Sequence, residues 1–205
     1  MKRFFAPAAK GIAVSLLILA AGAMTPARAD ALYRITVDTS SVSGQPGIID
    51  FQFNPGPGTP QAATAQVQSF SMVGGSLGAE ESPTGSVSGL LPGTVTLANT
   101  AADNEFAQDL TFGSSVTFIV DLSGPAVNSP NGNLIETSFF VTFYSPGFSS
   151  VLLTNNPNGP AGEIDIANGL ITTTPFPNVS GGPSNVSFTN LVPFLESTWW
   201  YWYVL

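Results

Sequence analysis

The 205-residue sequence contains no cysteine and no histidine, and these two absences exclude much of the chemistry that enzymes use. Without cysteine there is no disulfide framework, and without either residue the usual ligands of zinc and copper are missing. Nucleophilic catalysis by Ser-His-Asp or Cys-His is excluded for the same reason. Carboxylates, hydroxyls and a few basic groups are the side chains left for catalysis.

Basic residues are also scarce, and they are unevenly placed. Four of the five lie at or before Arg28, whereas all thirteen acidic residues lie at or after Asp30. The chain from Asp30 onward therefore has one cation, Arg34, against thirteen carboxylates, a net charge of −12. Such a surface cannot neutralise a run of phosphates or dock on anionic lipid, so we expect no nucleic-acid partner.

The first 29 residues have the three parts of a secretory signal peptide. Three basic residues within the first ten precede the apolar run GIAVSLLILAAGAM, and Ala27 and Ala29 place small residues at the −3 and −1 positions before Asp30. The apolar run is shorter than the ~20 residues that a membrane-spanning helix needs. We therefore predict cleavage after Ala29, export through the Sec pathway, and a location that is extracellular or in the outer cell envelope.

Short runs of alternating apolar and polar residues, separated by glycine and proline, recur after residue 30. No stretch shows a sustained helical period, so residues 30–177 are predicted to form an all-β domain, an antiparallel β-sandwich with jelly-roll-like topology. Residues 73–86 are expected to form the longest irregular loop. The clearest runs are LYRITVD (32–38), IIDFQF (48–53), SVTFIVDL (115–122) and TSFFVTFY (137–144), in which Tyr33, Ile35, Val37, Ile49, Phe51, Phe53, Val116, Phe118, Val120, Leu122, Phe139, Val141 and Phe143 face inward while Asp50 and Gln52 face outward.

Asn168-Gly169 is the strongest hairpin signal in the chain, because it joins two β-prone runs through two residues that accept positive φ. A two-residue type I′ turn there predicts a specific strand register. It sets Ala167 opposite Leu170, Ile166 opposite Ile171, and Asp165 opposite Thr172 on the solvent side.

Seven structural stretches between about Leu32 and Phe176 are similar to those of one known family. They are DTSS (38–41), IIDFQFNPG (48–56), QAATAQV (61–67), LPGTVTL (91–97), LTFGSSVTF (110–118), SGPAVNSPNG (123–132) and LLTNNPNG (152–159). With them the chain resembles the PEP-CTERM-type exported proteins of exopolysaccharide-producing Gram-negative bacteria. The resemblance implies an exported protein associated with an extracellular matrix, and it carries no catalytic motif.

The C-terminal stretch VPFLESTW (192–199) resembles the sorting tail of that family, which reads Val-Pro-Glu-Pro-Ser-Thr-Trp before a long apolar helix and a basic cluster. Here Phe-Leu is inserted, the second proline is missing, and neither the helix nor the basic cluster follows. We interpret residues 178–205 as a linker and a degenerate, aromatic-rich tail. The segment after Glu196 is too short to cross a hydrocarbon core about 30 Å thick, so no transmembrane anchor is expected in the mature chain.

Paired carboxylates are the candidate catalytic groups, because glycosidases use two of them beside a sugar ring. Asp50 and Asp121 lie on outward strand positions, and Glu163 and Asp165 lie two residues apart on one strand face. We interpret these carboxylates as surface charges that discourage association of sheet faces. The chain is therefore predicted not to be an enzyme, and no residue is assigned a catalytic, cofactor-binding or metal-binding role.

Two asparagine-rich loops leave calcium open as an alternative, although no cofactor is predicted. NSPNGNLIE (128–136) and NNPNGPAGEID (155–165) offer oxygen ligands around a glycine turn, but neither begins with the aspartate of an EF-hand loop. Asn-Gly is also a common turn signal. Arg34, on an outward strand position, could pair across strands with Asp50 or another carboxylate, and such an exposed pair would contribute only about 0–1 kcal/mol.

The expected function is that of a non-enzymatic exported protein of the cell envelope or extracellular matrix, associated with exopolysaccharide or envelope components. A carbohydrate-binding module, with or without calcium, is the second alternative, and a weak carboxylate-based glycoside-acting enzyme is the third. All three tryptophans lie within residues 199–202, and only Tyr33 and Tyr144 are tyrosines of the body. Because the phenylalanines are interpreted as core, no aromatic platform for a sugar is predicted.

Overall fold

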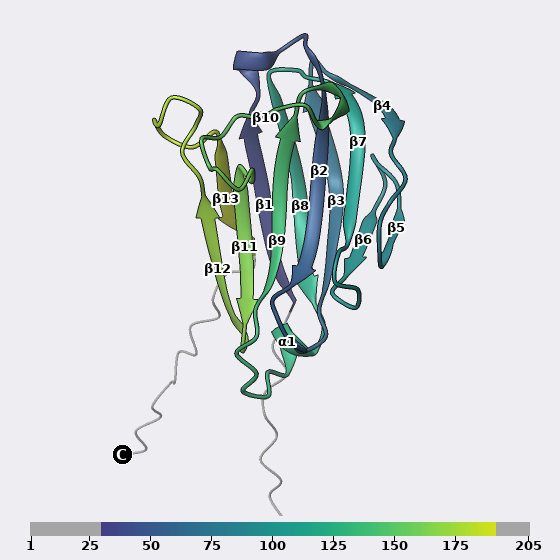
Figure 1. The fold of residues 1–205 in the computed structure, drawn as a ribbon, viewed down its shortest axis with the longest axis vertical. Coiled ribbons are helices and arrows are strands. Elements are labelled where there is room, and N and C mark those ends of the chain that lie inside the picture. The colour runs from purple at the N-terminus through teal and green to yellow at the C-terminus, as the bar shows by residue number, and fades with distance from the viewer. Residues whose placement is uncertain (1–29, 192–205) are drawn as a thin grey trace, which may run out of the picture.

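The computed structural model describes residues 30–191, which form two antiparallel β-sheets packed face to face (Figure 1). The predicted signal peptide (1–29) and the tail (192–205) lie outside the described residues. The strands are β1 (Ala31–Asp38), β2 (Pro46–Pro55), β3 (Thr64–Val73), β4 (Ser76–Glu80), β5 (Val87–Gly89), β6 (Val95–Ala98), β7 (Glu105–Thr111), β8 (Ser115–Ser123), β9 (Thr137–Tyr144), β10 (Val151–Leu152), β11 (Gly162–Ala167), β12 (Leu170–Pro175) and β13 (Val186–Asn190).

Helical structure within residues 30–191 is limited to three short pieces. They are the 3₁₀ turns η1 (Ser40–Val42) and η2 (Pro146–Phe148) and the helix α1 (Pro125–Asn128) at the lower end of the sandwich in Figure 1. None of the described helices is long and apolar enough to cross a membrane.

The strand order confirms the jelly-roll-like sandwich. Sheet A has the order β13-β1-β8-β3-β6-β5, and sheet B has the order β12-β11-β9-β2-β7-β4, with β10 also paired to β9. The pairs β1·β8, β2·β7 and β3·β6 are those that arise when one long antiparallel hairpin is rolled into two sheets. Strands β9, β11 and β12 then extend sheet B beyond β2, and β13 extends sheet A beyond β1.

The apolar faces of the two sheets form the core, as the alternating pattern predicts. All the residues expected to face inward are buried, and Phe51 lies at the centre of an aromatic cluster. Its ring centroid is 5.0 Å from that of Phe118 in an edge-to-face arrangement, and 5.9 and 6.3 Å from those of Phe139 and Phe106. The interpretation of most phenylalanines as core is therefore confirmed.

The Asn168-Gly169 hairpin forms with the predicted register. Asn168 and Gly169 have φ values of 49° and 74°, as a type I′ turn requires. Ala167 pairs with Leu170, Ile166 with Ile171, and Asp165 with Thr172. Asparagine and glycine tolerate positive φ at little cost, so two residues of local sequence were enough to fix the pairing of six on each side.

Two boundaries differ from the sequence prediction. The domain does not end at residue 177, because β13 pairs with β1 from Val37↔Val186 to Tyr33↔Asn190 and so belongs to sheet A. The stretch 73–86 is not a continuous loop, because β4 lies within it and pairs with β7. Both strands are short, exposed edge strands whose pairing depends on distant partners, so their local sequence gives a weak signal.

Candidate functional site

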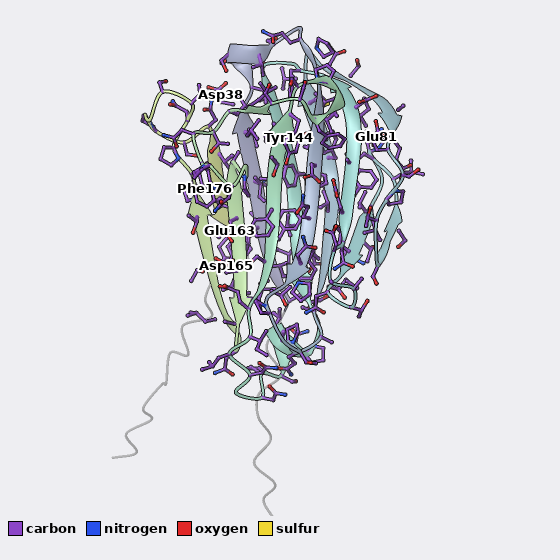
Figure 2. The ribbon with its side chains drawn as sticks, in the orientation of Figure 1. Asp38, Glu81, Tyr144, Glu163, Asp165 and Phe176 are labelled. Carbon is purple, nitrogen blue, oxygen red and sulfur yellow. The ribbon has the colours of Figure 1, made fainter. Side chains whose placement is uncertain are left out.

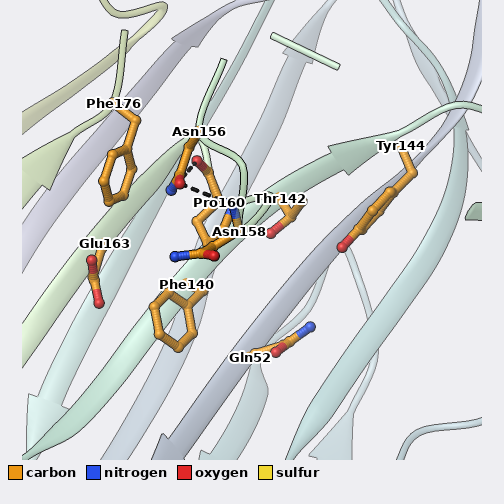
Figure 3. Close-up of a pocket in the computed structure, with 9 residues that line it drawn as sticks. All are labelled: Gln52, Phe140, Thr142, Tyr144, Asn156, Asn158, Pro160, Glu163 and Phe176. Atoms are coloured by element: carbon orange, nitrogen blue, oxygen red, sulfur yellow. Dashed lines mark hydrogen bonds between the residues drawn. The ribbon is translucent and has the colours of Figure 1, made fainter. Parts of the chain in front are cut away.

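A cleft lies on the outer face of sheet B, the face that points away from the core. Its volume is about 410 Å³, and we call it the sheet-B cleft (Figure 3). Its floor comes from the outward side chains of β2, β9 and β11, and its wall comes from the segment between β10 and β11. The lining residues are Gln52, Phe140, Thr142, Tyr144, Asn156, Asn158, Pro160, Glu163 and Phe176.

The wall is held in place by its own hydrogen bonds. Asn156 Nδ2 donates to the Pro160 carbonyl oxygen over 3.3 Å, and Asn156 Oδ1 accepts the Asn158 N–H over 3.1 Å. Between them Gly159 is buried with φ at 101°, where a Cβ would lie 3.7 Å from the Tyr144 hydroxyl. That distance is an ordinary contact, so glycine is needed here for its φ, which other residues rarely adopt. The loop that turns at Gly159 converts a flat sheet face into a cleft.

The strand register puts three side chains of the floor in one row across sheet B with Glu105 of β7. Glu163 pairs with Phe140, Phe140 with Gln52, and Gln52 with Glu105. Adjacent strands are about 4.8 Å apart, so the row runs roughly 14 Å from Glu163 to Glu105. Aromatic, amide and carboxyl groups thus alternate across the face, and Phe176 stands beside Glu163 at the β12 side (Figures 2 and 3).

Glu163 and Asp165 form an interacting carboxyl pair at one end of the cleft. Partial burial, then the charge of Asp165 and a hydrogen bond to it, and then the charge of Glu136 raise the pKa of Glu163 to about 7. Asp165 Oδ1 also accepts a 2.6 Å hydrogen bond from Ser138 Oγ. The Glu163 carboxyl therefore gains or loses its proton near neutral pH.

Asp50 lies beneath the floor rather than on the surface. It faces away from the core, as predicted, yet it is only 1 % exposed. Its Oδ2 accepts a 2.8 Å hydrogen bond from Gln52 Nε2, whereas its Oδ1 is buried without a hydrogen-bond partner. Burial, and then the charge of Glu105, raises the pKa of Asp50 to about 7, although the Gln52 hydrogen bond opposes the shift. The expectation that Asp50 is a solvated surface charge is therefore wrong.

The other candidate residues are not brought to this cleft. Asp121 and Arg34 lie on the outer face of sheet A, on the opposite side of the sandwich from Asp50. The proposed pairing of Arg34 with Asp50 is therefore wrong, and Asp50 and Asp121 form no pair. Arg34 is exposed on β1. Only Glu163 and Asp165 are adjacent on one face, as their spacing predicts.

The two loops considered for calcium use their amide oxygens to stabilise turns. Asn131 Oδ1 accepts the Asn133 N–H, and Asn133 Oδ1 accepts the Ile135 N–H. In the second loop Asn156 Oδ1 makes the equivalent bond to Asn158. Among residues 30–191 no group of three or more carboxylates is arranged to hold a metal ion. The described loops therefore give no support to the calcium alternative.

The aromatic lining was missed by the sequence reasoning. Phe140 and Tyr144 are on the outward face of β9, and Phe176 follows β12. A signal was present in TSFFVTFY, whose outward positions read Phe140, Thr142 and Tyr144, two of them aromatic. It was overlooked because outward aromatics are informative only when something covers them, and the covering loop is distant in sequence.

Comparison with protein-family models, curated proteins and solved structures finds no match. The geometry of the chain is therefore the basis for assigning its function.

Proposed function

We propose that the chain is an exported, non-enzymatic protein of the cell envelope or extracellular matrix that binds polysaccharide in the sheet-B cleft. The observation that carries the proposal is the lining of this cleft, where three aromatic side chains alternate with amide, hydroxyl and carboxyl groups. The predicted signal peptide and the resemblance to PEP-CTERM-type proteins support export and association with exopolysaccharide.

The chemistry of the lining matches that of a sugar. A pyranose has apolar C–H faces and a rim of hydroxyl groups, so it packs on aromatic side chains while its hydroxyls bond to amides and carboxylates. Phe140, Tyr144 and Phe176 supply the first kind of contact, and Gln52 and Asn158 supply the second. A volume of about 410 Å³ suits a short segment of a chain.

The charge of the cleft favours neutral or amine-bearing saccharides. Glu163, Asp165, Glu105 and Asp50 all lie on this side of sheet B, and Arg34, the only basic residue of the described chain, is on the other sheet. A polymer of uronic acids would be repelled by these carboxylates. An amino sugar would be attracted, since a cation would relieve the mutual repulsion of the Glu163–Asp165 pair.

The arrangement of the carboxyl groups favours binding over hydrolysis. A glycosidase holds its two carboxyls on either side of the scissile bond, separated by about 5–9.5 Å. Glu163 and Asp165 instead interact with each other on one strand, and Asp50 is covered. The glycoside-acting enzyme is therefore the weaker alternative.

Affinity for immobilised polysaccharide tests the proposal. The mature protein is passed over a neutral β-glucan, a partly deacetylated amino-sugar polymer and a polyuronate at pH 7.5, with and without chelator. We expect retention on the first or second, none on the polyuronate, and no effect of chelator.

Matched variants locate the binding site. Phe176→Ala and Phe140→Ala should reduce retention by about tenfold or more, because each removes a stacking contact. Val179→Ala and Leu170→Ala, which truncate side chains that are 66 % and 67 % exposed outside the cleft, should leave retention unchanged. Equal retention of all four variants, or retention of none of the polymers by the unmodified protein, would refute the binding role and leave a purely structural matrix protein.

A further inference from the structure

A second polar cluster lies at the other sheet, where the described chain begins. Asp30 precedes β1, Asp121 is on β8, and Asn128 ends α1. Leu32 pairs with Asp121, which places Asp30 diagonally next to Asp121 on the outer face of sheet A. Asn128 Nδ2 donates a 2.8 Å hydrogen bond to Asp30 Oδ1. Asp30 and Asn128 are 98 positions apart in sequence, yet they lie together at one end of the sandwich.

Two oxygen atoms of this cluster are buried without a hydrogen-bond donor. They are Asp121 Oδ1 and Asn128 Oδ1. Burial, and then the charge of Asp30, raises the pKa of Asp121. Each unpaired buried acceptor destabilises the fold, and the two carboxylates repel each other. A cation with several N–H donors would satisfy both oxygens and offset the repulsion between the carboxylates.

Processing of the precursor supplies such a group at the right residue. Hydrolysis of the Ala29–Asp30 peptide bond consumes one water, leaves a carboxylate on Ala29, and leaves an α-ammonium group on Asp30. We propose that the α-ammonium of Asp30, created by signal-peptide removal, is bound by Asp121 Oδ1 and Asn128 Oδ1 and locks the start of β1 to β8 and α1. Its three N–H groups match the two unpaired oxygens with one to spare for water.

The proposal explains why cleavage after Ala29, and not at a neighbouring bond, suits the folded domain. Cutting one residue earlier or later would move the ammonium by about 3.4 Å along the strand, and the proposed contact requires it at Asp30. It also gives processing a consequence beyond release, because the mature domain gains an interaction that the precursor cannot make. The inference depends on the predicted cleavage site and is independent of the polysaccharide-binding proposal.

Selective acetylation of the mature protein provides the test. Residues 30–205 contain no lysine, so the Asp30 α-amine is the only primary amine that an N-hydroxysuccinimide ester of acetic acid can modify stably. The free-amine protein should melt about 3–6 °C above the acetylated protein at pH 6.5, because acetylation removes the charge and two donors. Identical melting temperatures would overturn the proposal.

Variants separate the specific contact from the general effect of charge. In Asp121→Asn the difference between the free and acetylated forms should fall by at least half, whereas in Glu81→Gln it should be unchanged. Glu81 is exposed and lies outside the cluster, so the Glu81→Gln substitution removes an equal charge at a different place. An equal difference in both variants would show that only net charge matters, and the proposed contact would be rejected.

The acetylation rate gives a readout that does not depend on any variant. The titratable groups that face the Asp30 ammonium are the carboxylates of Asp30 and Asp121. Arg34 is the cationic residue near them, and it lies two residue pairs further along β1 than the Leu32–Asp121 pair. Two carboxylates beside the ammonium raise its pKa, and a rise of one unit lowers the reactive fraction about tenfold. Acetylation of the folded protein at pH 7 should therefore be about tenfold slower than in urea. An equal or faster rate in the folded protein would contradict the proposal.

Discussion

The outer faces of the two sheets are built from the same alternating pattern, yet they differ in kind. On sheet A, outward residues of β1 such as Arg34 and Asp38 are exposed. On sheet B, outward Asp50 and Thr142 are buried, and the face contains a cleft. At Thr142 the segment after β10 contributes to the difference, because Gly159 lies against Thr142 and Tyr144 on sheet B. An outward position in a strand fixes the direction of a side chain but does not by itself fix its exposure to solvent. Exposure depends also on what covers that face of the sheet.

The largest expected effect is a pH dependence that originates on the sheet-B side. The pKa of Asp50 is about 7 in the folded protein, above the ordinary value of about 3.9 in the unfolded chain. Between these values the folded state binds more protons, so the free energy of unfolding should fall as pH rises from 4 to 7 and then level off. The loss should be on the order of 2–4 kcal/mol, with a smaller addition from the more exposed Glu163.

Urea denaturation of the mature protein at pH 4.5 to 8.5 measures this dependence. Asp50→Asn should remove most of the slope and raise stability at pH 8, because a neutral amide replaces a buried charge. Glu81→Gln, at an exposed position, should keep the slope. A stability that rises with pH over this range would show that Asp50 is ionised in the folded state and is satisfied there.

A smaller effect is expected from the wall of the cleft. Gly159→Ala places a side chain at φ 101°, which should cost roughly 1–2 kcal/mol of unfolding free energy and displace the loop from Tyr144. Gly132→Ala is the matched control, since its φ is 86° and a Cβ there meets nothing within 4 Å. Both variants should lose stability, but only Gly159→Ala should lose polysaccharide retention. Loss in both would mean that strain alone, and not the cleft, controls retention.

The Ser138–Asp165 hydrogen bond should contribute about 1 kcal/mol, because it is short and partly buried. Ser138→Ala should therefore lower the urea midpoint at pH 8. Ser71→Ala is the control on sheet A, where the hydroxyl makes a 3.4 Å contact to a carbonyl on an exposed face. Equal losses for the two serines would show that the short bond is worth no more than the long one.

The smallest effect is expected on the exposed face of sheet A. Arg34→Gln should change the free energy of unfolding by less than about 0.5 kcal/mol, because the side chain is exposed and its interactions are screened. Thermal denaturation at 20 and 300 mM salt checks this expectation. A loss above 1 kcal/mol would mean that Arg34 stabilises the acidic domain by long-range electrostatic attraction to its carboxylates. The outer faces of the two sheets would then differ less than we propose.

Much of the fold could be predicted because its signals are local. The alternation in LYRITVD and SVTFIVDL fixes which side chains face inward, and Asn168-Gly169 fixes a register. The edge strands β4 and β13 could not be predicted in this way, because each is defined by its pairing with β7 or β1. The candidate site was only partly visible: the spacing of Glu163 and Asp165 put them on one face, whereas Phe140 and Tyr144 were not recognised.

By itself the sequence determined the direction of the side chains in the four clearest strands, the hairpin, and the concentration of acidic residues after Asp30. Those features depend on residue type and on a period of two, which act over a few positions. The tertiary structure alone decided that Asp50 is buried, that Phe140 and Tyr144 line a cleft, and that Asp30 meets Asp121 and Asn128. Each of these depends on contacts between segments that are far apart in sequence. A local pattern of side chains does not specify which distant segments will be in contact.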